Sequence, residues 1–258
     1  MTYKYITVAQ DGALTLVTIN RPEAYNALNA EAHIELAAAF DAFAADDSQW
    51  VAILAGAGGK AFCAGHDLKQ QASGGGLVTP PSGFGGLTAR FDLVKPVIAA
   101  VDGVAMGGGF ELALACDIIV ASQRSVFALP EPKVGLAALA GGIQRLPREI
   151  GLKRAMGMML TGRRVGAPEG YELGFVTEVV EGDVLAAARR WAADILAASP
   201  MSVRATKEAA LRGLDTPLAE ALKDEWDYPA MKAMLASDDA VEGPAAFAEK
   251  RAPAWKGR

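Results

Sequence analysis

The sequence has few of the residues that metal sites and disulfides require. Two histidines, His33 and His66, and two cysteines, Cys63 and Cys116, occur in 258 residues. No group of His, Cys and Asp has the spacing of metal ligands, so no metal is predicted. Both cysteines fall within apolar segments, which indicates small core residues rather than a disulfide.

Long apolar runs and blocks of basic residues are also absent. No stretch of about 18 uncharged apolar residues occurs, so no membrane span is expected. The N-terminus has no apolar or Arg-rich leader, which predicts a cytoplasmic protein. Net charge is −5 with scattered lysines and arginines, which argues against a nucleic-acid surface. Local cations such as Arg21 and Lys69 remain suited to a polyphosphate ligand.

Several common motifs are missing as well. There is no G-x-G-x-x-G, and the segment from Gly56 to Lys60 lacks the spacing and the Ser or Thr of a phosphate loop. The absence of G-x-S-x-G argues against a serine hydrolase. What is present is an apolar fraction of 52% and 28 glycines, which predict one large α/β domain or one domain with an appendage.

Strand and helix patterns alternate up to about residue 180, which predicts βα units. A helix is expected over 30–45, capped by Asn29, with Ile34, Ala37, Ala38 and Ala45 on its apolar face. The Gly- and Pro-rich segment 70–90 is expected to be a lid or a substrate wall. Strands are predicted over 13–19, 51–55, 96–101, 117–121 and 126–129.

The last third of the chain has helical patterns only. They cover 184–198, 202–214, 217–235 with a kink or split at Pro229, and 238–251 with an interruption at Gly243-Pro244. The expected division is a core over 1–198 and a helical C-terminal subdomain over 199–258. Such a helical region buries its apolar stripe on the body or on another subunit.

A glycine cluster at 107–109 precedes the predicted helix that carries Glu111. One interpretation is close packing between strand and helix, with Glu111 stabilised by the helix dipole. The other is that a ligand oxygen approaches the free N–H groups, with Glu111 acting as a base beside them. Sequence alone leaves both interpretations open.

Glu131 and His66 carry similar alternatives. Glu131 lies between two prolines that are expected to hold its backbone extended. It is either a solvated loop acid or a carboxyl group whose pKa is raised by apolar neighbours, able to deliver a proton. His66 follows Gly65 on a tight turn, and its backbone N–H is expected to matter more than its ring.

A further signal lies in seven segments spread over nearly the whole chain, namely 19–28, 61–68, 107–119, 129–131, 141–146, 160–163 and 242–251. Taken in order, they resemble the crotonase, or enoyl-CoA hydratase/isomerase, superfamily. This resemblance implies an α/β spiral of ββα units with two roughly perpendicular sheets. It also implies a helical C-terminal region that mediates a homotrimer or homohexamer.

The resemblance also implies a ligand and a set of site residues. The ligand is an acyl-CoA thioester, with coenzyme A as part of the substrate and no further cofactor. The thioester oxygen lies between the N–H groups of His66 and Gly108, and Glu111 and Glu131 are the two catalytic glutamates. The residues expected to bind the CoA portion are Arg21, Ala24, Ala64, His66, Asp67, Leu68 and Lys69.

Holding both glutamates favours reversible hydration of a trans-2-enoyl-CoA to a 3-hydroxyacyl-CoA. The alternatives are double-bond isomerisation, dehydration of another hydroxyacyl-CoA such as a carnitinyl thioester, and a non-catalytic acyl-CoA- or RNA-binding member. The segment 136–140 and the pair Pro132-Lys133 depart from the common hydratase pattern. Both lie near the acyl end of the expected site, so they bear on substrate choice.

Overall fold

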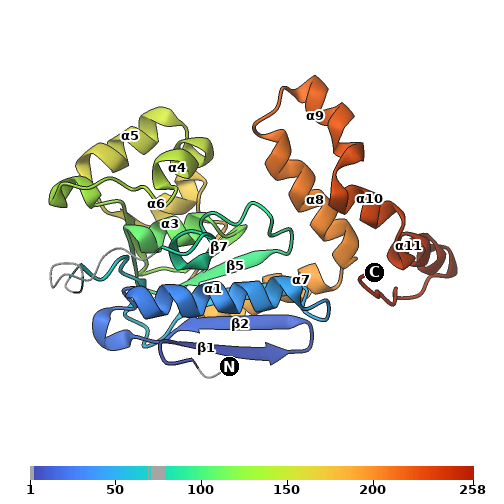
Figure 1. The fold of residues 1–258 in the computed structure, drawn as a ribbon, viewed down its shortest axis with the longest axis horizontal. Helices are drawn as coiled ribbons and strands as arrows, with labels where there is room; N and C mark the ends of the chain where they lie inside the picture. Colours follow the sequence, from blue (N-terminus) through green and yellow to red (C-terminus); the bar gives the residue numbers. More distant parts are fainter. Residues whose placement is uncertain (1–2, 69, 71–78) are drawn as a thin grey trace.

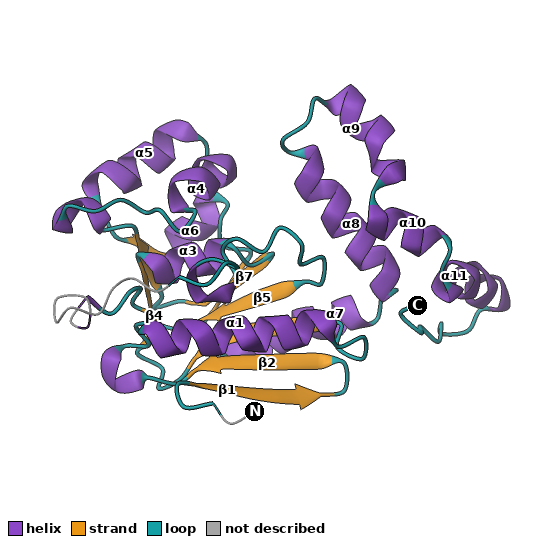
Figure 2. Cartoon of the chain, in the orientation of Figure 1, coloured by secondary structure: helices purple, strands orange, loops and turns teal. Residues whose placement is uncertain are grey.

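The computed structural model describes residues 3–68, 70 and 79–258. Its larger sheet has six strands in the order β1-β2-β3-β5-β7-β10 (Figure 2). The β1 and β2 pair is antiparallel and the remaining neighbours are parallel. These strands are β1 (Ile6–Asp11), β2 (Leu14–Ile19), β3 (Val51–Gly56), β5 (Val97–Val101), β7 (Ile118–Ser122) and β10 (Glu178–Val180).

The smaller sheet has four strands in the order β4-β6-β8-β9. Its bounds are β4 (Ala61–Cys63), β6 (Val104–Met106), β8 (Val126–Ala128) and β9 (Val165–Gly166). The consecutive pairs β3 and β4, β5 and β6, and β7 and β8 each place one strand in each sheet. The chain therefore winds as a spiral of two-strand turns, as the resemblance predicts.

The central strands of the larger sheet are buried on both faces. In β3, Ala52 and Leu54 face a core shared with α1 (Ala30–Ala45), while Val51, Ile53 and Ala55 face α7 (Val184–Leu196). This explains why β3 and β5 read as continuous apolar runs rather than alternating ones. Figure 1 shows α1 running nearly parallel to β1 and β2.

Helix α1 has the predicted bounds, and the side chain of its N-cap Asn29 accepts a hydrogen bond from the Ala32 N–H. The predicted apolar face is wrong in part, because Ala37 is buried as expected but Ile34 is 57% exposed and Ala45 is also exposed. Large side chains one turn apart outweigh the alanines, since they bury more apolar area. The buried face consists of Ala32, His33, Leu36, Ala37, Ala39, Phe40 and Phe43.

Shorter helices connect the strands and pack near the smaller sheet. The α-helices are α3 (Gly108–Leu114), α4 (Gly142–Ile150), α5 (Leu152–Thr161) and α6 (Ala167–Leu173). The 3-10 helices are η1 (Pro22–Ala24), η2 (Phe84–Gly86) and η3 (Glu131–Val134). Within the predicted lid, η2 is buried and packs against α1, while 71–78 lies outside the described residues.

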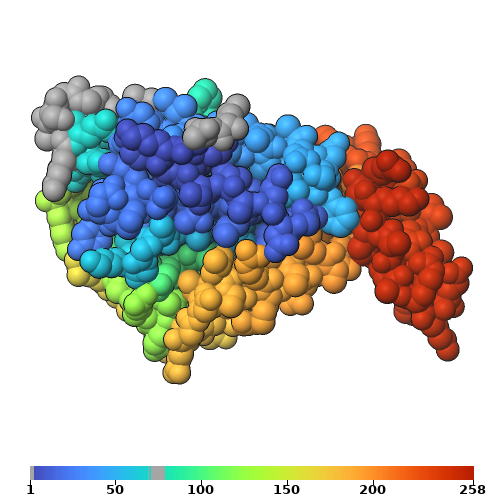
Figure 3. All heavy atoms as spheres, turned by 90° about the horizontal axis from the view of Figure 1, so that it is seen from below, coloured from blue at the N-terminus to red at the C-terminus, as the bar shows by residue number. Residues whose placement is uncertain are grey.

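The C-terminal helices project from one end of the sheets (Figures 1 and 3). They are α8 (Pro200–Gly213), α9 (Leu218–Asp224), η4 (Glu225–Asp227), α10 (Pro229–Leu235) and α11 (Asp238–Glu249). The predicted split at Pro229 is confirmed. The predicted interruption at Gly243-Pro244 is wrong, because α11 continues through Pro244 at the cost of one main-chain hydrogen bond. No described helix is both long and apolar enough to cross a membrane.

Candidate active site

The turn that carries His66 is held by main-chain hydrogen bonds to Leu28. The Leu28 N–H donates to the Gly65 carbonyl at 2.8 Å, and the Asp67 N–H donates to the Leu28 carbonyl at 3.0 Å. Gly65 has φ +95°, and a Cβ there would lie 3.2 Å from the Gly108 nitrogen. The turn after β4 therefore lies directly against the start of α3, which brings His66 and Gly108 together.

The glycines at the start of α3 permit this close approach. A Cβ on Gly109 would lie 2.0 Å from the Cys63 carbonyl oxygen, so only glycine fits there. The packing interpretation of the cluster is therefore confirmed. It leaves the other interpretation intact, because the main-chain N–H groups of His66 and Gly108 have no acceptor among the described residues.

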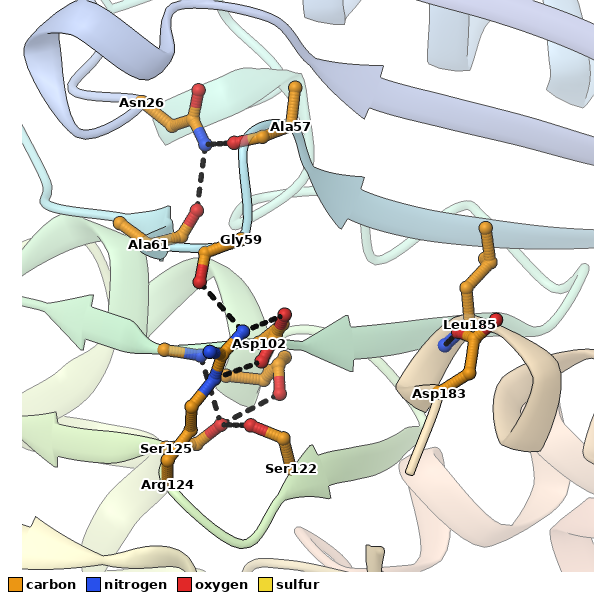
Figure 4. A network of polar contacts seen from close by, with 12 residues as sticks. Asn26, Ala57, Gly59, Ala61, Asp102, Ser122, Arg124, Ser125, Asp183 and Leu185 are labelled. Atoms are coloured by element: carbon orange, nitrogen blue, oxygen red, sulfur yellow. Dashed lines mark hydrogen bonds and ion pairs between the residues drawn. The ribbon is translucent and has the colours of Figure 1, made fainter. Parts of the chain in front are cut away.

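A buried asparagine joins the end of β3 in the larger sheet to the start of β4 in the smaller sheet. Asn26 is fully buried, and its side-chain nitrogen donates to the Ala57 carbonyl at 2.9 Å and the Ala61 carbonyl at 2.7 Å (Figure 4). Below it, Arg124 pairs with Asp102 and donates to the Gly59 carbonyl (Figure 4). These contacts hold the loop before β4, and thereby the segment that ends at His66.

Glu111 lies in the first turn of α3 and is only 3% exposed. The Gly142 N–H donates to its Oε1 at 2.8 Å. Burial, with a smaller contribution from the nearby Glu131 charge, raises the pKa of Glu111 to about 7. Glu111 therefore exchanges its proton near neutral pH.

Glu131 points toward the same turn from η3. A Cβ on Gly107 would lie 2.9 Å from its Oε1, and its Oε2 is buried without a hydrogen-bond partner among the described residues. Burial also raises the pKa of Glu131. The predicted extended backbone is wrong, because Glu131 opens a 3-10 helix in which Pro132 occupies the first turn, where its missing N–H costs nothing.

Two carboxyl groups that lie close together in a poorly solvated place cannot both ionise easily. Burial raises the pKa of Glu111 to about 7 and also raises that of the half-buried Glu131, so Glu111 is partly protonated near neutral pH. One member then suits a base and the other an acid. The pair lies beside the Gly108 N–H, for which the described part of the chain offers no acceptor, since Gly107 touches Glu131 and Glu111 follows one turn later.

A cleft of about 690 Å³ opens at the His66 turn. Its lining contains the described residues predicted for the CoA site, namely Arg21, Ala24, Ala64, His66, Asp67 and Leu68. Lys69 lies outside the described residues. Arg21 pairs with Asp67 at 3.1 Å and donates to the Ala27 carbonyl, so its guanidinium is held at the cleft wall.

Sequence reasoning missed several residues of the site. Tyr25, Ala27, Asn29 and other residues also line the cleft, and Gly142 anchors Glu111. The Gly141-Gly142 pair at the start of α4 is visible in the sequence as a turn. The sequence does not show that the Gly142 N–H bonds to Glu111, which is 31 residues away. Among the described residues, no three His, Cys, Asp or Glu side chains gather where they would hold a metal ion.

Known proteins are similar to this chain in both sequence and fold. The model of the enoyl-CoA hydratase/isomerase family matches residues 9–258. A carnitinyl-CoA dehydratase from Escherichia coli K12 is 42% identical over 259 residues, covering 97% of this chain and 98% of that protein. Another from Salmonella typhi is also 42% identical over 259 residues, with the same coverage of both chains.

Solved structures agree with these relatives. An enoyl-CoA hydratase from Mycobacterium tuberculosis H37Rv is 42% identical and superposes with a TM-score of 0.93, covering 98% of this chain and 99% of that chain. One from Bacillus anthracis is 35% identical with a TM-score of 0.89, covering 99% and 100%. The fold is thus that of crotonase-type lyases and isomerases. The chain belongs to the enoyl-CoA hydratase/isomerase family of the crotonase superfamily.

Proposed function

We propose that this protein catalyses the reversible addition of water across the C2–C3 double bond of a trans-2-enoyl-CoA. Glu111 takes a proton from water, whose oxygen adds to C3. The negative charge that develops on the thioester oxygen is stabilised by the N–H groups of His66 and Gly108. Glu131 then delivers a proton to C2. In the reverse direction the two glutamates exchange roles and water leaves.

One arrangement supports this proposal above all others. Buried Glu111 and half-buried Glu131, both with raised pKa, lie beside the main-chain N–H groups of His66 and Gly108, which have no acceptor among the described residues, and His66 also lines the cleft. A general acid or base contributes roughly 10²–10⁴ in rate. Removing one oxyanion donor typically costs roughly 10²–10³. No redox cofactor or metal takes part in this scheme, and coenzyme A is part of the substrate.

The test follows the ultraviolet absorbance of the conjugated enoyl thioester with crotonyl-CoA and longer chains. The protein should remove this absorbance and form 3-hydroxyacyl-CoA. Glu131→Gln should lower kcat at least about 10²-fold while leaving the Kd of a saturated acyl-CoA nearly unchanged. Glu169→Gln, at an exposed pair with Arg163, is the matched control and should retain full activity. Wild-type activity in Glu131→Gln would refute its assigned role.

The carnitinyl-CoA dehydratase relatives make dehydration of a 3-hydroxyacyl thioester the second candidate. The bond chemistry is the same reaction in reverse, so the two candidates differ in the acyl group. Comparing kcat/KM for crotonyl-CoA and crotonobetainyl-CoA separates them. Isomerisation is the third candidate, and it needs Glu131 alone. A Glu111→Ala variant with full activity on a 3-enoyl-CoA would favour it.

A homotrimer or homohexamer is part of the proposal. The C-terminal helices expose many large apolar side chains, an arrangement typical of a subunit interface. Light scattering should therefore give a mass of at least three chains, and a monomer would contradict this. The exposed residues are Leu211, Leu214, Leu218, Leu222, Trp226, Leu235, Val241 and Phe247.

A further inference from the structure

The two histidines of the chain lie against each other beside the cleft. Their ring centroids are 6.1 Å apart with planes 28° from parallel. His33 is fully buried on α1 and meets the Phe84 ring edge-on at 4.5 Å, while His66 lines the cleft. Phe84 in turn packs on Gly108, where a Cβ would lie 2.4 Å from its ring. A continuous wall thus runs from Gly108 to His66.

This wall has unused hydrogen-bonding capacity. The Gly85 N–H donates to His33 Nδ1 at 3.0 Å, so the neutral ring carries its proton on Nε2. That Nε2 and both ring nitrogens of His66 are buried and have no hydrogen-bond partner among the described residues. Buried polar groups without partners are costly, and native structures usually satisfy them. Two of these three nitrogens belong to His66, which lines the cleft, and the third belongs to His33 directly behind it; within the described part of the chain none of them has a partner, so an oxygen of a ligand could supply one.

The charge of the two histidine rings decides which kinds of ligand oxygen can bind to them. Burial lowers the pKa of His66 and that of His33, the latter to about 4, so both rings are neutral at neutral pH. A neutral pair does not compensate the charge of a carboxylate, and a quaternary ammonium has no hydrogen-bonding atom to offer it. A hydroxyl group accepts from His33 Nε2–H and donates to the unprotonated nitrogen of His66. A carbonyl oxygen accepts from either ring.

We propose that His33 and His66 form a polar subsite that selects acyl thioesters whose acyl group carries an uncharged oxygen, as a hydroxyl or a carbonyl, close to the reacting carbons. The location supports this, because the wall begins at Gly108, where the thioester oxygen binds in the proposed function. The subsite rests on that function in taking an acyl-CoA as ligand and in placing the thioester oxygen at Gly108. Its nitrogens are shielded from bulk water, so an oxygen on the acyl group meets little competition from solvent.

Binding of saturated thioesters tests the subsite without any turnover. Calorimetry would compare hexanoyl-CoA with 4-oxohexanoyl-CoA, 5-oxohexanoyl-CoA and 6-hydroxyhexanoyl-CoA on the whole protein. At least one oxygenated ligand should bind about threefold to tenfold more tightly than hexanoyl-CoA, the gain typical of one net hydrogen bond. Equal Kd values for all four ligands would overturn the proposal and leave an internal water as the partner of the nitrogens.

Substitutions of His33 and His66 test whether these two residues cause the preference for oxygenated acyl groups. His66→Leu and His33→Leu should bind all four ligands alike, whereas His33→Gln, which keeps a side-chain donor, should retain part of the preference. A preference that persists in His66→Leu would overturn the proposal, and this variant decides alone where His33→Leu does not fold. A preference that is intact in a protein without hydratase activity would refute the proposed function and leave the subsite standing.

Discussion

Replacing Glu111 with Gln should stabilise the protein at alkaline pH and much less at acidic pH. The folded state raises the pKa of this carboxyl group from 4.5 to about 7, so the folded protein binds its proton more tightly than the unfolded chain. The stabilisation from that proton is complete below the unfolded pKa and is lost as pH rises through the folded pKa. A shift of this size corresponds to about 3 kcal/mol. Gln keeps an oxygen for the Gly142 N–H without the buried charge.

The assay is urea unfolding at pH 5 and pH 8.5 at fixed protein concentration. The free energy of unfolding of Glu111→Gln relative to wild type should increase by about 2–3 kcal/mol between these conditions. Glu169→Gln is the control without a pH dependence in this window, because Arg163 lowers the pKa of Glu169 and its ionisation is nearly complete in both states above about pH 5. An equal effect of Glu111→Gln at both pH values would refute the claim that Glu111 is buried with a raised pKa.

Three further predictions follow from the site. In pH–rate profiles with crotonyl-CoA, kcat/KM should fall about tenfold for each pH unit below pH 7, because Glu111 must be ionised to act as a base. A profile that stays flat down to about pH 5.5 would contradict this prediction. Asn26→Ala should cost about 2–4 kcal/mol in urea unfolding, since two carbonyls lose their donor, and a loss under about 1 kcal/mol would contradict it. Gly109→Ala should abolish activity, because the added methyl group forces α3 away from Cys63. Gly157→Ala is the control: open space surrounds Gly157, so this variant should retain activity and its free energy of unfolding should rise by up to about 1 kcal/mol. Equal activity of the two variants would contradict this prediction.

Much of the spiral was predictable because its signals are local. The β3 run, the Asn29 cap and the split at Pro229 are set by residues near each other in the chain, and all three were located correctly. The buried face of α1 was not, because the position of Ile34 depends on which large side chains the sheet accepts.

Some features of the candidate site were likewise predictable from local sequence, and others were not. Local sequence patterns reveal the glycines beside Glu111 and the turn at His66. The structure brings these two segments together. The Gly142 donor to Glu111 and the contact between His33 and His66 join segments more than 30 residues apart. No local pattern encodes such pairs, since the sheet register decides which turns meet. The prolines around Glu131 predicted the wrong backbone because a first-turn proline also suits a 3-10 helix.

The most direct test of the central claim, that Glu111 and Glu131 act as a paired base and acid, is proton NMR of crotonyl-CoA turnover in D₂O. Wild-type protein should give 3-hydroxybutyryl-CoA with one deuterium at C2, and Glu111→Gln and Glu131→Gln should each slow this at least about 10²-fold. An unchanged thioester with the wild-type protein, or labelled product from either variant at the wild-type rate, would contradict the account.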